Sequence, residues 1–279
     1  MDLKILKQFI KIDQIILILS LGYLGLLFAG KAFIEVWLLF TLAIVSAGIA
    51  HESFKKFQGE KTRLGKPSLK DFIDSAGNKQ KRPVLLSGII SSAVFILSSF
   101  WINDPSYYLS ILSVVILIGF PFLSKYNSMP TFNLGIFFAL CPVGGFIAAN
   151  NRFELIPAIL FAAVLFWTTG TEISGAIYEI QNDKHKKNFL LEKIGIKKAK
   201  ALSFIFFIFS FLILILAGFI AVRGLAYWIS LFCFAIVLIK QQVLLRSKDT
   251  ETAKKEFIQI NNFIAPLLLV GTFIDVFFH

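Results

Sequence analysis

The sequence predicts an all-α, polytopic membrane protein with nine transmembrane helices. Two observations support this fold class. Hydrophobic residues make up 57% of the 279 positions and charged residues only 16%, and the mean hydropathy is +0.77. A water-soluble domain with so few charges could not cover that much apolar surface. The apolar residues are also grouped into long runs that include most of the 32 phenylalanines, whose rings lipid accepts readily.

Nine runs are candidates to cross a bilayer, which takes roughly 17–25 residues as a helix. Helices are required because a backbone amide in lipid must find its hydrogen bond within its own segment. The first run is short unless residues from Phe9 onward extend it. In the fifth, Pro142–Gly145 is expected either to kink the helix or to allow close packing. The runs are Ile15–Leu27, Phe33–Ala50, Val84–Trp101, Tyr107–Leu123, Phe132–Ala149, Leu155–Ile173, Ala201–Val222, Leu225–Leu245 and Phe263–Phe278.

The positive charges predict the orientation. With the N-terminus in the cytoplasm, all of the 28 Lys and Arg residues except Lys31, Arg152 and Arg223 fall in cytoplasmic segments. The two long loops, at 51–82 and roughly 179–200, are then cytoplasmic. The sequence thus indicates a multi-pass protein of the plasma (inner) membrane. Most of these lysines are expected to contact anionic membrane lipid, and no nucleic-acid partner is expected.

The carboxylates at the end of the sixth run point to a functional site. Glu172, Glu179 and Asp183 are separated by seven and four residues, which places them on one face of a helix. Glu172 lies about two turns inside the apolar run, where an ionised carboxylate is costly and normally faces a polar cavity. The alternative is a protonated Glu172 that is hydrogen-bonded to a neighbouring helix.

Carboxylates four residues apart can share a divalent cation, and Mg²⁺ suits such a site because it completes its sphere with water and phosphate oxygens. Fixed cations are then expected nearby to neutralise the remaining phosphate charge. Arg82 at the start of the third run and Lys125 between the fourth and fifth are the candidates. His51 and His185 border the acidic residues without forming a convincing metal pair, and exposed loop positions are expected for both.

At this point the sequence resembles the UbiA superfamily of intramembrane prenyltransferases. Residues Phe166–Glu172 (FWTTGTE) resemble the family's FWTxGxD run, and Glu179 and Asp183 follow in register with the second acidic motif. Leu191–Ala199 (LEKIGIKKA) resembles the family's LPxRLGxxxA run. Phe120–Tyr126 (FPFLSKY), with Pro130 and Leu134-Gly135, is similar to YPFxKRxT…P…LG. Asn78–Pro83 (NKQKRP), with Ser87-Gly88, resembles NKPxRPxxSG.

The resemblance covers nearly the whole chain, so it implies a single transmembrane domain over residues 1–279 with a central apolar cavity. The most similar subfamily is the 4-hydroxybenzoate polyprenyltransferase type, which implies quinone biosynthesis. The implied activity is transfer of an isoprenoid chain from a prenyl diphosphate to an aromatic or other lipid-soluble acceptor. The resemblance implies Mg²⁺ held by Glu52, Glu179 and Asp183, with Arg82, Lys125 and Lys79 contacting the diphosphate. It assigns Glu172, deeper on the same helix, to orienting the acceptor or stabilising positive charge.

The first acidic motif departs from the family pattern NDxxDxxxD. Its equivalent is His51–Gly59 (HESFKKFQG), in which Glu52 keeps a carboxylate, Lys55 takes the second acidic position and Gly59 the third. Asp71 and Asp74 are candidates to fold back as replacement metal ligands. Alternatively, Lys55 pairs with a phosphate directly in place of one magnesium ion.

Three other functions remain open. The first is a UbiA-type terpene cyclase, in which the substrate's own double bonds attack the carbocation. The second is a non-catalytic member that binds prenyl lipids or partner proteins, which the altered first motif favours. A transporter ranks last, because its polar residues would continue across the bilayer, whereas here they gather on one side.

Overall fold

The computed structural model describes residues 12–30, 33–58, 81–124, 130–182, 189–247 and 249–278, and all regular structure within these ranges is α-helical. The number and order of the predicted helices are confirmed within this part of the chain. The helices are α2 (Ile12–Phe28), α3 (Ile34–Gln58), α5 (Arg82–Ile102), α6 (Asp104–Ser124), α7 (Pro130–Asn150), α8 (Leu155–Asn182), α9 (Phe189–Ile220), α10 (Leu225–Leu244) and α11 (Thr250–Phe278).

The helices have the length and polarity of membrane spans. In the described ranges, six are long and apolar enough to cross a bilayer, and α2, α6 and α7 carry shorter apolar stretches. Large hydrophobic side chains such as Leu38, Phe232 and Phe273 are exposed around the outside, which suits a protein surrounded by lipid. The chain is therefore a multi-pass integral membrane protein.

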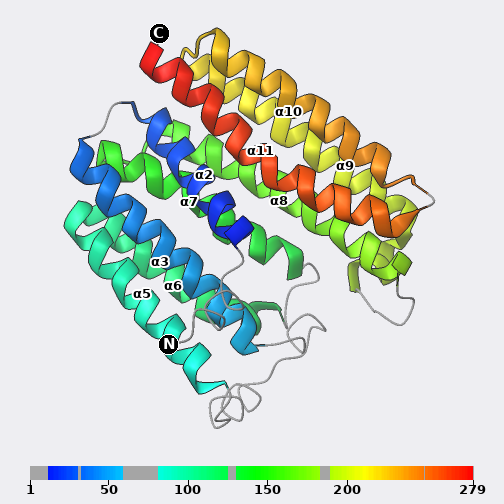
Figure 1. Ribbon diagram of the computed structural model, residues 1–279, viewed down its shortest axis with the longest axis horizontal. Helices are drawn as coiled ribbons and strands as arrows, with labels where there is room; N and C mark the ends of the chain where they lie inside the picture. The colour runs from blue at the N-terminus through cyan, green and yellow to red at the C-terminus, as the bar shows by residue number, and fades with distance from the viewer. Residues whose placement is uncertain are drawn as a thin grey trace.

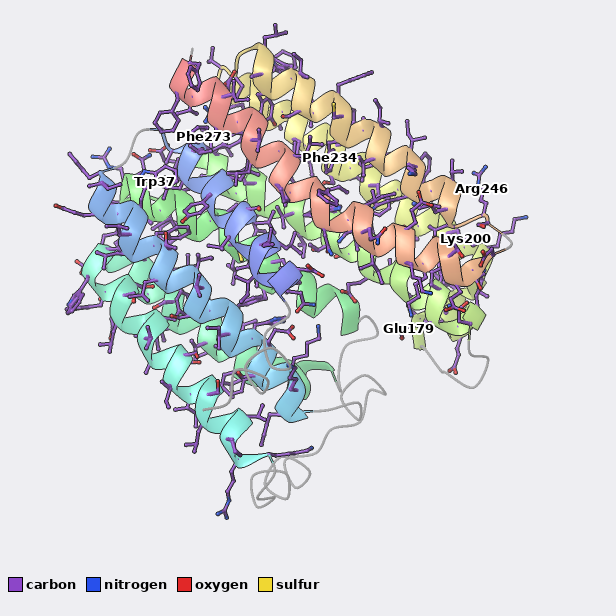
Figure 2. The ribbon with its side chains drawn as sticks, in the orientation of Figure 1. Trp37, Glu179, Lys200, Phe234, Arg246 and Phe273 are labelled. Atoms are coloured by element: carbon purple, nitrogen blue, oxygen red, sulfur yellow. The ribbon has the colours of Figure 1, made fainter. Side chains whose placement is uncertain are left out.

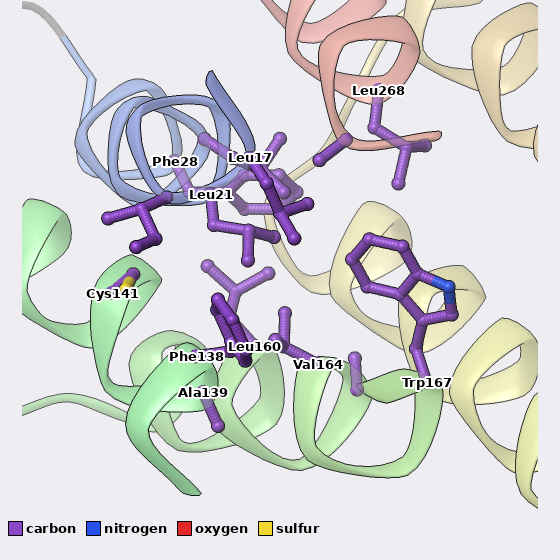
Figure 3. Packing of buried hydrophobic residues seen from close by; sticks show 14 of the residues in the cluster. Leu17, Leu21, Phe28, Phe138, Ala139, Cys141, Leu160, Val164, Trp167 and Leu268 are labelled. Carbon is purple, nitrogen blue, oxygen red and sulfur yellow. The ribbon is translucent and has the colours of Figure 1, made fainter. Parts of the chain in front are cut away.

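The helices form two groups that meet at α2 and α7 (Figure 1). On one side α3 packs against α5, and α5 and α7 both pack against α6; on the other, α8 packs against α9 and α10 against α11. Helix α2 contacts α7 and α11, so it joins the two groups. The buried cluster in Figure 3 shows this junction, where Leu17 and Leu21 of α2 lie over Phe138 of α7 and Leu160 of α8.

Close backbone contact holds α2 against α7. A Cβ atom added at Gly25 would lie 1.8 Å from the carbonyl oxygen of Pro142, and one added at Gly145 would lie 1.9 Å from that of Gly22. Small residues let membrane helices approach this closely, which increases van der Waals contact. Helix α7 continues through Pro142. Of the two roles expected for Pro142–Gly145, close packing is the one that these contacts show.

Four helices extend by two turns or more beyond the apolar runs, all at the same end of the molecule. Helix α3 continues past Ala50 to Gln58, α8 past Ile173 to Asn182, α9 begins at Phe189 and α11 at Thr250. The expected loops at 51–82 and 179–200 therefore begin too early, and the second also ends too late. Hydropathy falls where charged residues begin, whereas the backbone hydrogen bonds of a helix continue. Glu179, Lys200 and Arg246 lie at this end in Figure 2, opposite Trp37 and Phe273; we call it the polar end.

A polar cluster ties the helices together at the opposite end. Arg223, in the turn between α9 and α10, donates from Nη2 to the carbonyl oxygen of Leu27 at 2.9 Å, and its guanidinium lies 4.5 Å from the centre of the Phe28 ring. Asp275 of α11 accepts a hydrogen bond from the Gly224 N–H at 3.0 Å. Burial lowers the pKa of Arg223, and the charge of Asp275 opposes that shift. This clasp connects α2, α10 and α11.

Candidate functional site

The first turns of α7 lie between the acidic ends of α3 and α8. On the α3 side, the Phe137 ring stacks on His51 with centroids 4.6 Å apart and planes inclined by 7°. On the α8 side, a Cβ atom at Gly135 would lie 2.9 Å from Oγ1 of Thr168. Glu52 follows His51 directly, and Glu172 lies one turn after Thr168. Both carboxylates therefore lie close in sequence to residues that contact the first turns of α7.

Glu52 is a buried carboxylate with an unsatisfied oxygen. Its side chain is only 4% exposed, and Oε1 has no hydrogen-bond partner in the described part of the chain. Among the described residues, the groups that face this oxygen are Nζ of Lys55 at 3.6 Å and Nδ1 of His51 at 3.7 Å, both beyond hydrogen-bond distance. A buried carboxylate in this state is costly unless a cation or donor reaches it. The oxygen therefore favours a positive group close by, and the Lys55 ammonium is the nearest one among the described residues.

The position expected for His51 is wrong. The residue is buried, and its ring stacks on Phe137 and makes an edge contact with Phe138, both of α7. The sequence places it at the start of a polar stretch, but α3 continues as a helix and turns this side chain toward the core. His51 thus packs α3 onto α7 beside Glu52, a role that no local pattern in the sequence indicates.

Helix α5 supports the same end of α3. Oγ of Ser53 donates to Oγ of Ser87 at 3.3 Å, and Nζ of Lys81 donates to the carbonyl oxygen of Phe57 at 3.3 Å. A Cβ atom at Gly88 would lie 3.3 Å from the Phe54 ring. Ser87-Gly88 therefore serves helix packing. Arg82 is the first residue of α5 and is exposed at the polar end.

On α8, most of the Phe166–Glu172 run is explained by packing. Thr168 donates to the carbonyl oxygen of Val164 at 2.7 Å, and Gly170 allows α9 to approach so closely that a Cβ atom there would lie 2.9 Å from the Phe207 ring. Glu172 and Glu179 remain half-buried on the same continuous helix. Both carboxylates thus lie on α8, with Glu179 two turns nearer the polar end, whereas the third member of the predicted face, Asp183, lies outside the described residues.

Several predicted site residues lie outside the described residues. These are Asp183, Lys125, Lys79, Asp71 and Asp74. Within the described ranges, no group of three or more His, Cys, Asp or Glu side chains is arranged to hold a metal ion. The metal and diphosphate roles assigned to these residues therefore stay predictions.

An apolar cavity of about 480 Å³, its open mouth included, lies between α3, α5, α6 and α7. Phe137 forms part of its wall, so the cavity begins at the residue that stacks on His51 beside Glu52. The hydroxyls of Ser110 and Ser113 in its wall donate to carbonyl oxygens of their own helix, at 2.7 and 2.8 Å. These two serines thus leave space without offering a free donor. The other lining residues include Phe40, Ala47, Phe95, Leu109 and Cys141.

Residues 75–263 match the UbiA prenyltransferase family. The 4-hydroxybenzoate octaprenyltransferase of Photobacterium profundum is 24% identical over 257 residues, covering 87% of this chain and 84% of the relative. The enzyme of the same name from Aeromonas hydrophila subsp. hydrophila is 23% identical over 207 residues, covering 71% and 69%.

Two solved structures share the fold. The apo structure of a UbiA homolog from Aeropyrum pernix K1 has a TM-score of 0.78 at 21% identity, covering 95% of this chain and 99% of that one. The structure of a UbiA homolog from Archaeoglobus fulgidus bound to GPP and Mg²⁺ has a TM-score of 0.61 at 12% identity, covering 95% and 98%. At these identities the likeness is one of fold.

Proposed function

This chain belongs to the UbiA prenyltransferase family, and we propose that it moves an isoprenoid chain from a prenyl diphosphate to an aromatic or other lipid-soluble acceptor. The observation that carries the proposal is the position of Phe137. Its ring forms the wall of an apolar cavity and stacks on His51, next to the buried carboxylate of Glu52. A ligand with an apolar tail and a charged head, bound by oxygen-rich and basic groups, suits this junction.

The substrate would lie along the axis of the bundle. Its tail would occupy the cavity, and its diphosphate would lie at the polar end, near Glu52 of α3 and Glu179 of α8. Mg²⁺ held by the carboxylates would neutralise part of the diphosphate charge. The remaining charge would be neutralised by the basic residues Arg82, Lys79 and Lys125. The chain would act as a single domain over residues 1–279.

Mg²⁺ is the proposed cofactor, and the residues fit it unequally. On α8, Glu179 is a half-buried carboxylate, and with Asp183 it would supply the hard oxygen ligands that Mg²⁺ prefers. On α3, Glu52 is the only carboxylate that the altered first motif keeps, and it already faces the Lys55 ammonium at 3.6 Å. We therefore assign Mg²⁺ to the α8 carboxylates. When bound there, it would stabilise negative charge on the departing diphosphate.

The proposed reaction breaks the allylic carbon–oxygen bond, and its electron pair leaves with the diphosphate. A ring carbon of the acceptor forms the new carbon–carbon bond, and the ring then loses a proton. Basic side chains at the polar end would stabilise the developing diphosphate charge, and the apolar cavity would exclude water from the allylic cation. Glu172, deeper on α8, would orient the acceptor or stabilise positive charge. The names of the relatives favour a 4-hydroxybenzoate-like acceptor, which belongs to quinone biosynthesis.

The orientation is also part of the proposal. We place the polar end and the N-terminus in the cytoplasm of a plasma (inner) membrane, because this orientation puts nearly all Lys and Arg residues on the cytoplasmic side. The charged diphosphate of the substrate would then reach the site from the cytoplasmic side, and its apolar tail would enter from the membrane.

The test is prenyl transfer by purified protein in lipid vesicles. Labelled geranyl, farnesyl and geranylgeranyl diphosphates would be offered with 4-hydroxybenzoate and other aromatic acceptors, with Mg²⁺ and with EDTA. We expect Mg²⁺-dependent product that Glu179→Gln and Asp183→Ala reduce at least ~100-fold, the range for loss of a group acting in the transition state. Glu251→Gln is the matched control, since it makes the same carboxylate-to-amide change at an exposed site paired with Lys255.

Other outcomes would identify the alternatives. Release of diphosphate without an acceptor, with a cyclic hydrocarbon or alcohol as product, would replace the transferase with a terpene cyclase. Binding of prenyl diphosphate without turnover of any substrate pair would contradict the enzymatic proposal and identify a non-catalytic lipid-binding member.

A further inference from the structure

The Lys55 ammonium lies beside the Glu52 carboxylate, at the place where a bound cation would otherwise lie. Glu52 is almost fully buried and presents an oxygen without a hydrogen-bond partner among the described residues. Lys55 is three residues later on the same helix, so the helical backbone holds its ammonium on the side of this oxygen. The Lys55 side chain is 32% exposed, which leaves the ammonium accessible from the polar end.

A second divalent cation at this oxygen is disfavoured. The ammonium lies 3.6 Å from Oε1 of Glu52, so a metal ion bound to that oxygen would lie within a few ångströms of a positive charge in a partly buried environment, where repulsion is weakly screened. The other group facing the oxygen is Nδ1 of His51, at 3.7 Å on a ring that is stacked on Phe137. Among the described residues, no third His, Cys, Asp or Glu side chain forms a metal-holding group with Glu52 and His51.

The ammonium suits a phosphate group instead. Lysine has three N–H donors and no acceptor, so one donor can satisfy Glu52 while the others face outward. It is also a compact point charge that binds phosphate oxygens well. Ligand binding would draw Lys55 into a position between two anionic groups, which would give the Glu52 oxygen the partner that it lacks.

We propose that Lys55, anchored by Glu52, contacts the diphosphate directly and takes the place of a metal ion on the α3 side of the site. This inference rests on the proposed function, because it needs a diphosphate ligand. It assigns Glu52 as a positioning residue for Lys55, where the family resemblance implies a metal ligand. Divalent cation would then be held on the α8 side alone.

The test counts metal ions and measures diphosphate binding without requiring transfer. Reconstituted protein would be titrated with Mn²⁺, followed by electron paramagnetic resonance, in the presence of the non-transferable analogue geranyl thiodiphosphate. We expect Lys55→Asp to bind one more Mn²⁺ per chain than the unchanged protein, because it places a second carboxylate one turn from Glu52. We expect Glu52→Gln to leave the Mn²⁺ count of the unchanged protein as it is.

Analogue affinity measured in EDTA provides the second readout. Lys55→Met should weaken binding about 10- to 100-fold, the loss expected for one charge-assisted contact. Lys55→Arg should retain most of the affinity, which would show that the charge matters and that the fold tolerates a change at this position. Lys56→Met is the matched control, since it removes a neighbouring positive charge from the same helix end.

Two results would overturn the inference. One is a Mn²⁺ ion that the unchanged protein binds and that Glu52→Gln loses; the other is unchanged analogue affinity in Lys55→Met. The second of these results would leave the prenyltransferase proposal standing. Failure of the unchanged protein to bind the analogue even with Mg²⁺ present would refute both.

Discussion

At the scale of single residues, the motif positions divide into packing residues and charged side chains that packing does not explain. Gly135 and Gly170 are required by close approach, because a side chain at either would meet α8 or α9 atoms at 2.9 Å. For Glu52, Glu172 and Glu179, helix packing by itself does not account for a carboxylate. The matching stretches of sequence therefore owe much of their pattern to helix contacts, and the chemistry that we propose would rest on a few side chains between them.

Gly170→Ala tests this division. The added methyl group would lie 2.9 Å from the Phe207 ring and 3.2 Å from the Ser203 carbonyl oxygen, so we expect a loss of about 1–3 kcal/mol of stability from overpacking. Thermal unfolding in detergent would measure it. Gly175→Ala on the same helix, where a Cβ atom meets nothing within 4 Å, should not destabilise. The double variant Gly170→Ala/Phe207→Leu should recover part of the loss; equal stability of the two single variants would contradict the packing account.

At the scale of elements, the ends of helices decide how the site and its supports are placed. Helix α9 ends in a Schellman motif, in which the Arg223 N–H donates to the Gly218 carbonyl at 3.0 Å and the Val222 N–H to that of Phe219 at 3.2 Å. Val222 consequently adopts φ = 48°, a left-handed conformation that β-branched residues rarely occupy. The strain is retained at the residue that positions Arg223 in the clasp.

Val222→Gly should stabilise the protein by about 1 kcal/mol, since glycine adopts the left-handed region without the steric cost that valine carries. Val222 is highly exposed, so little packing is lost. The midpoint of thermal unfolding would be compared with that of Asn151→Gly, which changes another left-handed residue, φ = 54°, at which asparagine is already tolerated. A gain no larger in Val222→Gly than in Asn151→Gly would argue against stored strain.

The cavity is the second feature at this scale. Its walls on α3 run from Phe40 to Ala47, about two helical turns or ~10 Å, which is well short of the ~30 Å hydrocarbon core. A long isoprenoid tail would therefore extend beyond the cavity, whereas a short tail would match its length more closely. Ser110 on α6 is one of the small residues that keep this space open.

Ser110→Phe should shift substrate preference toward short chains. We expect the ratio of kcat/KM for geranyl over geranylgeranyl diphosphate to rise at least ~10-fold, the range in which pocket size discriminates apolar substrates. Leu112→Phe, which enlarges a lipid-facing side chain of the same helix, is the control and should leave the ratio unchanged. An equal loss of activity with all chain lengths would contradict a role for this cavity in tail binding.

At the scale of the whole molecule, the two ends have different tasks. The polar end carries the helix extensions with Glu52, Lys55 and Glu179. The opposite end holds the Arg223 clasp, which ties α2 to α10 and α11. The Arg223 contacts thus hold the helices together at one end, and the charged side chains lie at the other.

Cysteine labelling would test the orientation that we propose for these ends. In a background of Cys141→Ala and Cys233→Ala, Asn151→Cys should react with a membrane-impermeant maleimide in intact cells, while Ser247→Cys should react only after permeabilisation. Both positions are exposed, and labelling after permeabilisation controls for reactivity. The reverse pattern would place the polar end outside the cytoplasm.

How far the sequence predicts the molecule depends on the range of the interactions involved. The number and order of the nine helices in the described part of the chain follow from hydropathy, because a bilayer imposes a minimum length on each apolar run. Their true ends did not follow: α3 reaches Gln58 and α8 reaches Asn182 through charged turns, since helical hydrogen bonding does not depend on hydropathy. The resemblance identified Glu52 as the carboxylate that the first motif keeps and Lys55 as a departure from it, but neither their distance nor their burial could be read from it.

The sequence by itself determined the fold class, the membrane location, the family and the end of the molecule at which polar groups gather. These properties are encoded in the length, charge and order of short segments. Only the tertiary structure decided that His51 is buried against Phe137 and that α7 lies between the acidic helices. It also decided that the Glu52 oxygen faces Lys55 and has no hydrogen-bond partner within the described ranges. The physical reason is that burial arises when helices distant in sequence pack together, and packing determines which polar atoms find partners and which are left to bind a ligand.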